Sequence, residues 1–114
     1  YYRWLFFAAG PLESALSNKA LGVEVPPDRE RMVGYGKLST VIDTLEAAVS
    51  GRSYLCGNIF TAADVYLGSQ IGWGLQFGTI DKRPAFEEYW AQISDRDAYR
   101  RASELDDAAM PANK

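Results

Sequence analysis

The stretch from Val65 to Phe77 contains no charged residue. Residues at helical spacing on its expected inner face are Val65, Gly68, Ile71, Gly72 and Leu75. Bulky side chains on its other sides are Tyr66, Trp73 and Phe77. A helix without charge on any side is usually surrounded by other elements. The stretch therefore predicts a central helix, about Ala62 to Phe77, on which the rest of the chain packs.

The residues before this helix, "NIFTAADV", form a capping pattern. With Thr61 as N-cap, its hydroxyl accepts from the Asp64 backbone N–H, and the Asp64 carboxylate reaches back to the Thr61 N–H. Phe60 and Val65 occupy the two positions of a hydrophobic staple. Capping of this kind contributes about 1 kcal/mol to stability. We predict that these four residues start and anchor the central helix.

Apolar residues at helical spacing predict four more helices, and no segment alternates as a strand does. The first runs from Tyr1 to about Ala20, with a kink or short break at Gly10-Pro11 because proline removes a backbone donor. The others are Asp28 to about Ser50, Pro84 to Ser94, and a short last helix that starts between Asp95 and Asp97. The predicted fold class is all-α: a single bundle of about five helices. Residues 1–114 form one domain with a weakly ordered tail at 106–114, and its first helix begins mid-element, as if truncated at Tyr1.

Glycines mark the second of these helices. We expect Gly34 and Gly36 to lie inside it, where each weakens a helix by up to about 1 kcal/mol and permits close packing. We expect Gly51 to end it. Its predicted buried stripe is Tyr35, Leu38, Val41, Ile42, Leu45 and Val49.

Several kinds of chemistry lack their residues. The chain has no histidine and one cysteine, which excludes His-based triads, zinc sites and Cys-x-x-Cys pairs within it. The "GYGK" segment at 34–37 lacks the P-loop spacing. The formal net charge of -3 argues against nucleic acid and anionic membranes as partners. We therefore predict no catalytic residue, metal site or bound cofactor in this chain.

Cys56 has two interpretations. It is a small, partly buried apolar thiol, or it is a reactive thiolate activated by a helix N-terminus or a cation such as Arg52. The first is the simpler, and the sequence leaves the reactivity of Cys56 open. A lone cysteine also fits a reducing, cytoplasmic compartment.

The first helix is apolar on two sides. One stripe contains Trp4, Leu5, Ala8, Leu12 and Ala15, and a second row contains Tyr2, Phe6 and Ala9. Such a helix has more than one partner: a core, another domain or another subunit.

The segment "YLCGNIFTAADV", followed by an uncharged helix and then by "RPAFEEYW", resembles the C-terminal helical domain of glutathione transferases, particularly the bacterial cytosolic ones. The residues that match the family's motif are Tyr54, Leu55, Gly57, Phe60, Thr61, Ala63, Asp64 and Val65. "YYRWLFFAAGPLE" is similar to the first helix of that domain, so the resemblance covers essentially the whole chain.

The resemblance implies a division of labour. In the family a thioredoxin-like domain in front binds glutathione and activates its thiol. The helical domain lines the pocket of the hydrophobic co-substrate and supplies part of a homodimer interface. By position, the pocket or domain-facing candidates here are Tyr1, Tyr2, Leu5, Phe6 and Ala9, although packing in the core explains any one of them equally well. Thr61 and Asp64 carry over as folding residues.

A rival interpretation belongs to another class. The same helical domain serves in protein–protein docking without catalysis, and Trp4, Trp73, Trp90 and the two-sided first helix fit that role as well. The presence or absence of a thioredoxin-like segment ahead of Tyr1 discriminates between the two.

Overall fold

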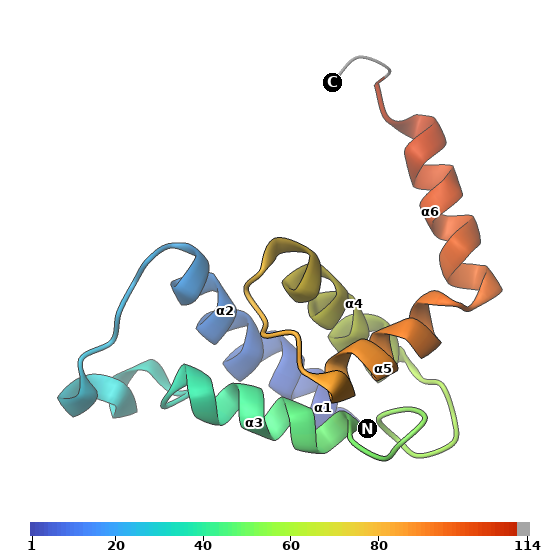
Figure 1. Ribbon diagram of the computed structural model, residues 1–114. Helices are drawn as coiled ribbons and strands as arrows, with labels where there is room; N and C mark the ends of the chain where they lie inside the picture. The colour runs from blue at the N-terminus through green and yellow to red at the C-terminus, as the bar shows by residue number, and fades with distance from the viewer. Residues whose placement is uncertain (112–114) are drawn as a thin grey trace.

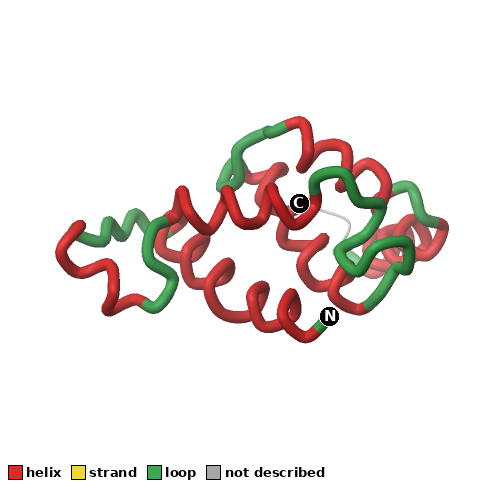
Figure 2. The backbone as a smooth tube through the Cα atoms, turned by 90° about the horizontal axis from the view of Figure 1, so that it is seen from below, coloured by secondary structure: helices red, strands yellow, loops and turns green. Residues whose placement is uncertain are grey.

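The computed structural model describes residues 1–111, which contain six α-helices, two other helical segments and no strand (Figures 1 and 2). The elements in chain order are α1 (Tyr2–Phe7), η1 (Ala8–Leu12), α2 (Glu13–Ala20), η2 (Pro27–Val33), α3 (Leu38–Val49), α4 (Ala62–Phe77), α5 (Pro84–Ser94) and α6 (Asp97–Ala109). The all-α class is confirmed. The described residues have six α-helices instead of about five because the first predicted helix is divided in two.

That division is a π-helical turn at the predicted break. α1, η1 and α2 follow one another without a loop, and Pro11 lies inside the π-helical segment η1. Proline has no N–H to donate, and a wider turn is one of the ways in which a helix accommodates the lost bond. Ala8, Leu12 and Ala15 are buried along the inner side of this rod.

The second predicted helix is wrong from residue 28 to residue 37. Residues 27–33 form the 3-10 segment η2, and the α-helix begins only at Leu38, so Asp28 caps no α-helix. Gly34 and Gly36 lie between the two with φ of 78° and 80°, and a Cβ added at either would meet nothing within 4 Å. These glycines serve a left-handed backbone that breaks the helix, and they do not permit close packing. Downstream, Gly51 has φ 69° just after the C-cap residue Ser50, as predicted.

α4 has the predicted bounds and runs through the middle of the bundle. It contacts α1, η1 and α5, and its inner side buries Ala63, Asp64, Leu67, Gly68, Ile71, Gly72 and Gly74. The prediction that other elements surround α4 is wrong on one side. Val65 is 55% exposed, Trp73 62% and Phe77 72%. α4 therefore has a core face and an uncovered apolar face.

The contact between α4 and α5 depends on glycines. A Cβ added at Gly72 would lie 2.5 Å from the Trp90 ring, and one added at Gly68 would lie 2.9 Å from Ile93. α5 itself begins at Pro84, in the first turn, as predicted.

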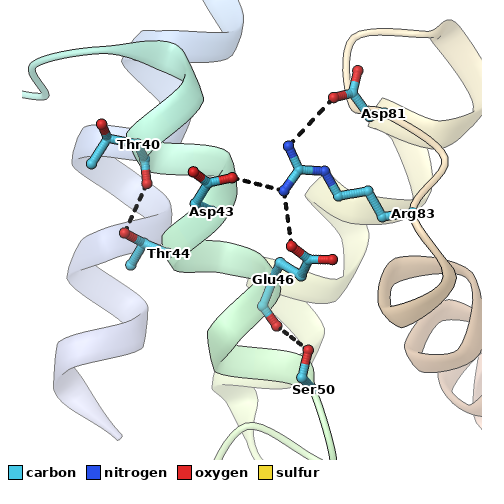
Figure 3. A network of polar contacts seen from close by, with 7 residues as sticks. All are labelled: Thr40, Asp43, Thr44, Glu46, Ser50, Asp81 and Arg83. Carbon is cyan, nitrogen blue, oxygen red and sulfur yellow. Dashed lines mark hydrogen bonds and ion pairs between the residues drawn. The ribbon is translucent and has the colours of Figure 1, made fainter.

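Arg83 ties the end of the α4–α5 loop to α3 (Figure 3). Its Nη1 atom lies 2.9 Å from Asp43 Oδ1 and 2.9 Å from Glu46 Oε1, and its Nη2 atom lies 3.6 Å from Asp81 Oδ2. Hydrogen bonding to Asp43 and then to Glu46 raises the pKa of the Arg83 guanidinium above its usual value. Arg83 is thus held by carboxylates and has a structural role.

α6 projects away from the other helices, and among the elements it contacts only α5 (Figure 1). The ring centroids of Tyr99 and Trp90 are 5.3 Å apart in an edge-on arrangement. α6 continues to Ala109, so residues 106–109 of the predicted tail are helical, whereas 112–114 lie outside the described residues. Among residues 1–111, no helix has both the length and the hydropathy needed to cross a membrane.

Candidate functional site

Asp64 is the buried polar centre of the molecule. Its side chain is 0% exposed, and it accepts at both oxygens. Oδ2 accepts a hydrogen bond from the Thr61 backbone N–H at 3.0 Å, and the Thr61 side chain accepts one from the Asp64 backbone N–H. The predicted capping box is therefore confirmed. Oδ1 accepts from the Leu55 N–H at 2.9 Å and from the Tyr89 hydroxyl at 2.6 Å. One carboxylate therefore joins the loop before α4, α4 itself and α5.

The sequence pattern did not identify Tyr89 and Leu55 as donors to Asp64. The helical period of the segment from Pro84 to Ser94 predicts that Tyr89 lies on its buried face, and Tyr89 is indeed only 2% exposed. A buried phenol needs a hydrogen-bond partner. This requirement was the one sequence signal that could have pointed to the hydrogen bond between Tyr89 and Asp64.

The two residues of the predicted hydrophobic staple, Phe60 and Val65, are less buried than expected. Phe60 is half-buried, its ring lies edge-on to Tyr54 at 5.5 Å between centroids, and the Arg96 guanidinium lies 3.6 Å above it. Val65 is more than half exposed. Both residues line a hollow of about 420 Å³ between α4 and α6.

Burial and the Asp64 carboxylate raise the pKa of Tyr89 far above its ordinary value. Because an unfolded tyrosine ionises near pH 10 while the folded Tyr89 stays protonated, the stabilisation is complete below about pH 10 and is lost as the pH rises further.

We expect Tyr89→Phe to lower stability at pH 7 by about 1 kcal/mol, through the lost hydrogen bond. The variant should also lose stability less steeply above pH 10. Urea unfolding from pH 7 to 11 measures both, and parallel pH profiles for the two proteins would contradict the assignment.

Cys56 is exposed, so the expectation of a partly buried thiol is wrong. The Thr61 hydroxyl lies 3.8 Å from its Sγ atom. Arg52 donates to the Leu55 carbonyl at 3.3 Å and is engaged there. The reactivity of Cys56 stays an open prediction.

The five predicted pocket residues lie along α1 and its flanks. Tyr1, Tyr2, Phe6 and Ala9 are exposed, and Leu5 is half-buried against the core. The rings of Tyr2 and Phe6 are stacked, with centroids 6.5 Å apart. They form an exposed aromatic row, and none of the five lines the hollow described next.

A groove of about 770 Å³ separates α2 from the uncovered face of α4. The α2 side contributes Glu13, Leu16, Ser17 and Ala20, which share one helical face. The other side is formed by Val65, Tyr66, Ser69, Gln70, Trp73, Gly74, Phe77 and Thr79. Apolar walls with a few polar groups are typical of small-molecule sites.

The polar side chains that line this groove include Glu13, Tyr66 and Gln70. The Tyr66 hydroxyl donates to Glu13 Oε2 at 3.3 Å, and burial, followed by the Glu13 charge, raises the Tyr66 pKa. The Gln70 Nε2 atom donates to the Ala8 carbonyl at 3.2 Å. Its Oε1 atom is buried and receives no hydrogen bond from the described residues. An unsatisfied buried acceptor costs about 1–3 kcal/mol.

Comparisons of the chain with protein-family models, curated proteins and solved structures found no match.

Proposed function

We propose that the chain is the helical domain of a glutathione transferase-like protein, and that its α2–α4 groove forms the wall of a pocket for a hydrophobic electrophile. In this proposal a thioredoxin-like domain ahead of Tyr1 binds glutathione, the co-substrate, and lowers the pKa of its thiol. This chain contributes no catalytic residue. The parent protein would be a cytoplasmic homodimer that conjugates glutathione to small electrophiles.

The observation that supports the proposal is the two-sided character of α4. Its core face carries the Asp64 capping box and the glycine contacts with α5. Its other face exposes Val65, Trp73 and Phe77 beside a groove of about 770 Å³. Aromatic side chains that are more than half exposed next to a groove of this size indicate a surface that receives a ligand or another domain.

A second function, a protein–protein interaction module, is favoured by a different surface. The stacked pair of Tyr2 and Phe6 stands on the outer row of α1, about 70% exposed in each case (69% and 71%). Exposed aromatic rows are typical of docking surfaces. In this alternative the chain binds a partner protein through α1 and has no transferase parent.

The test is glutathione conjugation by the full-length gene product with a hydrophobic aryl electrophile. We expect Trp73→Ala to raise KM for the electrophile about tenfold, because a lost aromatic contact of about 1.4 kcal/mol corresponds to that factor. KM for glutathione should stay unchanged. Leu105→Ala, at an exposed apolar residue of α6, is the matched control. Equal KM values for the two variants would show that the groove is not part of the electrophile pocket. An inactive wild type would favour the interaction module.

A further inference from the structure

The polar groups of the α2–α4 groove select one kind of ligand. We propose that the groove binds an apolar aromatic molecule that carries a protonated amine. Its ammonium group lies at the Glu13 carboxylate and its ring lies against Trp73 and Phe77. This inference rests on the proposed function, which assigns the groove to a small molecule.

The charge of the groove comes from Glu13. It is the one charged residue among the described residues that line the groove, and its carboxylate lies 3.3 Å from the Tyr66 hydroxyl. That hydrogen bond holds the carboxylate beside the aromatic wall. A cation, Lys19, also lies at the edge of the groove, where its Nζ atom donates to the carbonyl of the lining residue Thr79 at 3.0 Å. Glu13 and Lys19 are six residues apart on α2, which corresponds to about 9 Å along the helix axis. The negative charge of Glu13 is therefore separated along the helix from the positive charge of Lys19.

The hydrogen-bonding capacity of the groove also favours a donor. Gln70 is fixed through Nε2 by the Ala8 carbonyl, so its remaining atom, Oε1, is an acceptor that receives no donor from the described residues. Glu13 is an acceptor as well. An ammonium group has three donors and no acceptor, so it complements the Glu13 carboxylate, whereas a carboxylate on the ligand would meet another acceptor of the same charge.

The apolar part of the groove favours the same ligand. Tyr66, Trp73 and Phe77 lie at i, i+7 and i+11 on one face of α4. Their rings offer stacking surface to an aromatic body and attract a cation over their faces. Groove shape, charge and donor count therefore agree.

The experiment is isothermal titration calorimetry of the full chain with three probes of one shape: 1-naphthylmethylamine, 1-naphthalenemethanol and 1-naphthoate. We expect the protonated amine to bind about tenfold more tightly than the neutral alcohol, and the anion to bind most weakly. Glu13→Gln keeps an acceptor for Tyr66 but removes the charge, so most of the preference for the amine over the alcohol should be lost. Glu104→Gln on α6 changes the net charge by the same amount outside the groove lining and should leave the preference intact.

Equal affinity for amine and alcohol in the wild type would overturn the inference, and so would an equal effect of Glu13→Gln and Glu104→Gln. In either case alcohol binding that is lost in Trp73→Ala would leave the proposed function standing, because the groove would still hold an apolar molecule. Absence of binding by all three probes would overturn both.

Discussion

Replacing Asp64 with Ala is expected to lower the free energy of unfolding by about 3–5 kcal/mol, a large part of the 5–15 kcal/mol that holds a typical domain. The Asp64 carboxylate accepts from the backbone N–H groups of Thr61 and Leu55 and from the Tyr89 hydroxyl. Alanine leaves the buried Leu55 N–H and Tyr89 hydroxyl, and the partly buried Thr61 N–H, without this partner. Each such donor costs about 1–3 kcal/mol. The loss therefore exceeds the roughly 1 kcal/mol of an ordinary N-cap.

Urea unfolding followed by circular dichroism measures this loss. Asp64→Asn keeps one acceptor oxygen and should lie between wild type and Asp64→Ala. Asp107→Ala, an exposed carboxylate of α6, is the matched control and should change stability by less than about 0.5 kcal/mol. A cost for Asp64→Ala no larger than that of Asp107→Ala would show that the carboxylate does not join α4, α5 and the loop.

Gly72→Ala is expected to destabilise by about 2 kcal/mol, although alanine is the better helix former. The added Cβ would lie 2.5–2.7 Å from three atoms of the Trp90 ring, so either the ring or the two helices must shift. Overpacking of this kind costs up to about 3 kcal/mol, and the propensity gain returns about 1 kcal/mol.

Gly10→Ala is the control for this prediction. Gly10 lies in a helical segment, and a Cβ there would meet nothing within 4 Å, so alanine should be neutral or stabilising. In a Trp90→Phe background, where the ring is shorter, Gly72→Ala should cost less, and the double-mutant cycle gives the coupling. Similar effects of alanine at positions 10 and 72 would contradict the close contact between α4 and α5.

The parts of the fold that follow local rules were predictable from the sequence. The bounds of α4, its capping box, the break at Pro11 and the start of α5 at Pro84 are all set by residues next to one another in the chain. Capping and proline chemistry act within one turn of a helix, and this explains why a single sequence reveals them.

Features that depend on the sign of the backbone angle φ, or on contacts between residues far apart in the chain, were not predictable. Gly34 and Gly36 resemble packing glycines in a helical pattern, and only their positive φ shows that they break the helix. The Tyr89 hydroxyl reaches Asp64 across 25 positions of the chain. The exposure of Trp73 and Phe77 results from which neighbours α4 has, so an all-apolar helix looked fully buried.

The groove illustrates the same limit. Its walls come from α2 and α4, which lie some 50 positions apart, as the Glu13–Tyr66 hydrogen bond shows (separation of 53). The pocket candidates were placed on α1 by the position of its second apolar row in the family resemblance. Tyr2 and Phe6 stay candidates for a domain-facing surface, whereas the structure adds a separate groove beside them.

The proposal that this chain is the helical domain of a glutathione transferase-like protein is tested most directly by the coding sequence upstream of Tyr1. We expect that sequence, once determined, to encode a thioredoxin-like βαβ segment with a cis-Pro turn and a Ser, Tyr or Cys near its start. The full-length product should then conjugate glutathione, while the 114-residue chain alone should pass through a glutathione resin unretained. An upstream sequence without such a segment, or clear retention of the chain alone, would contradict the claim.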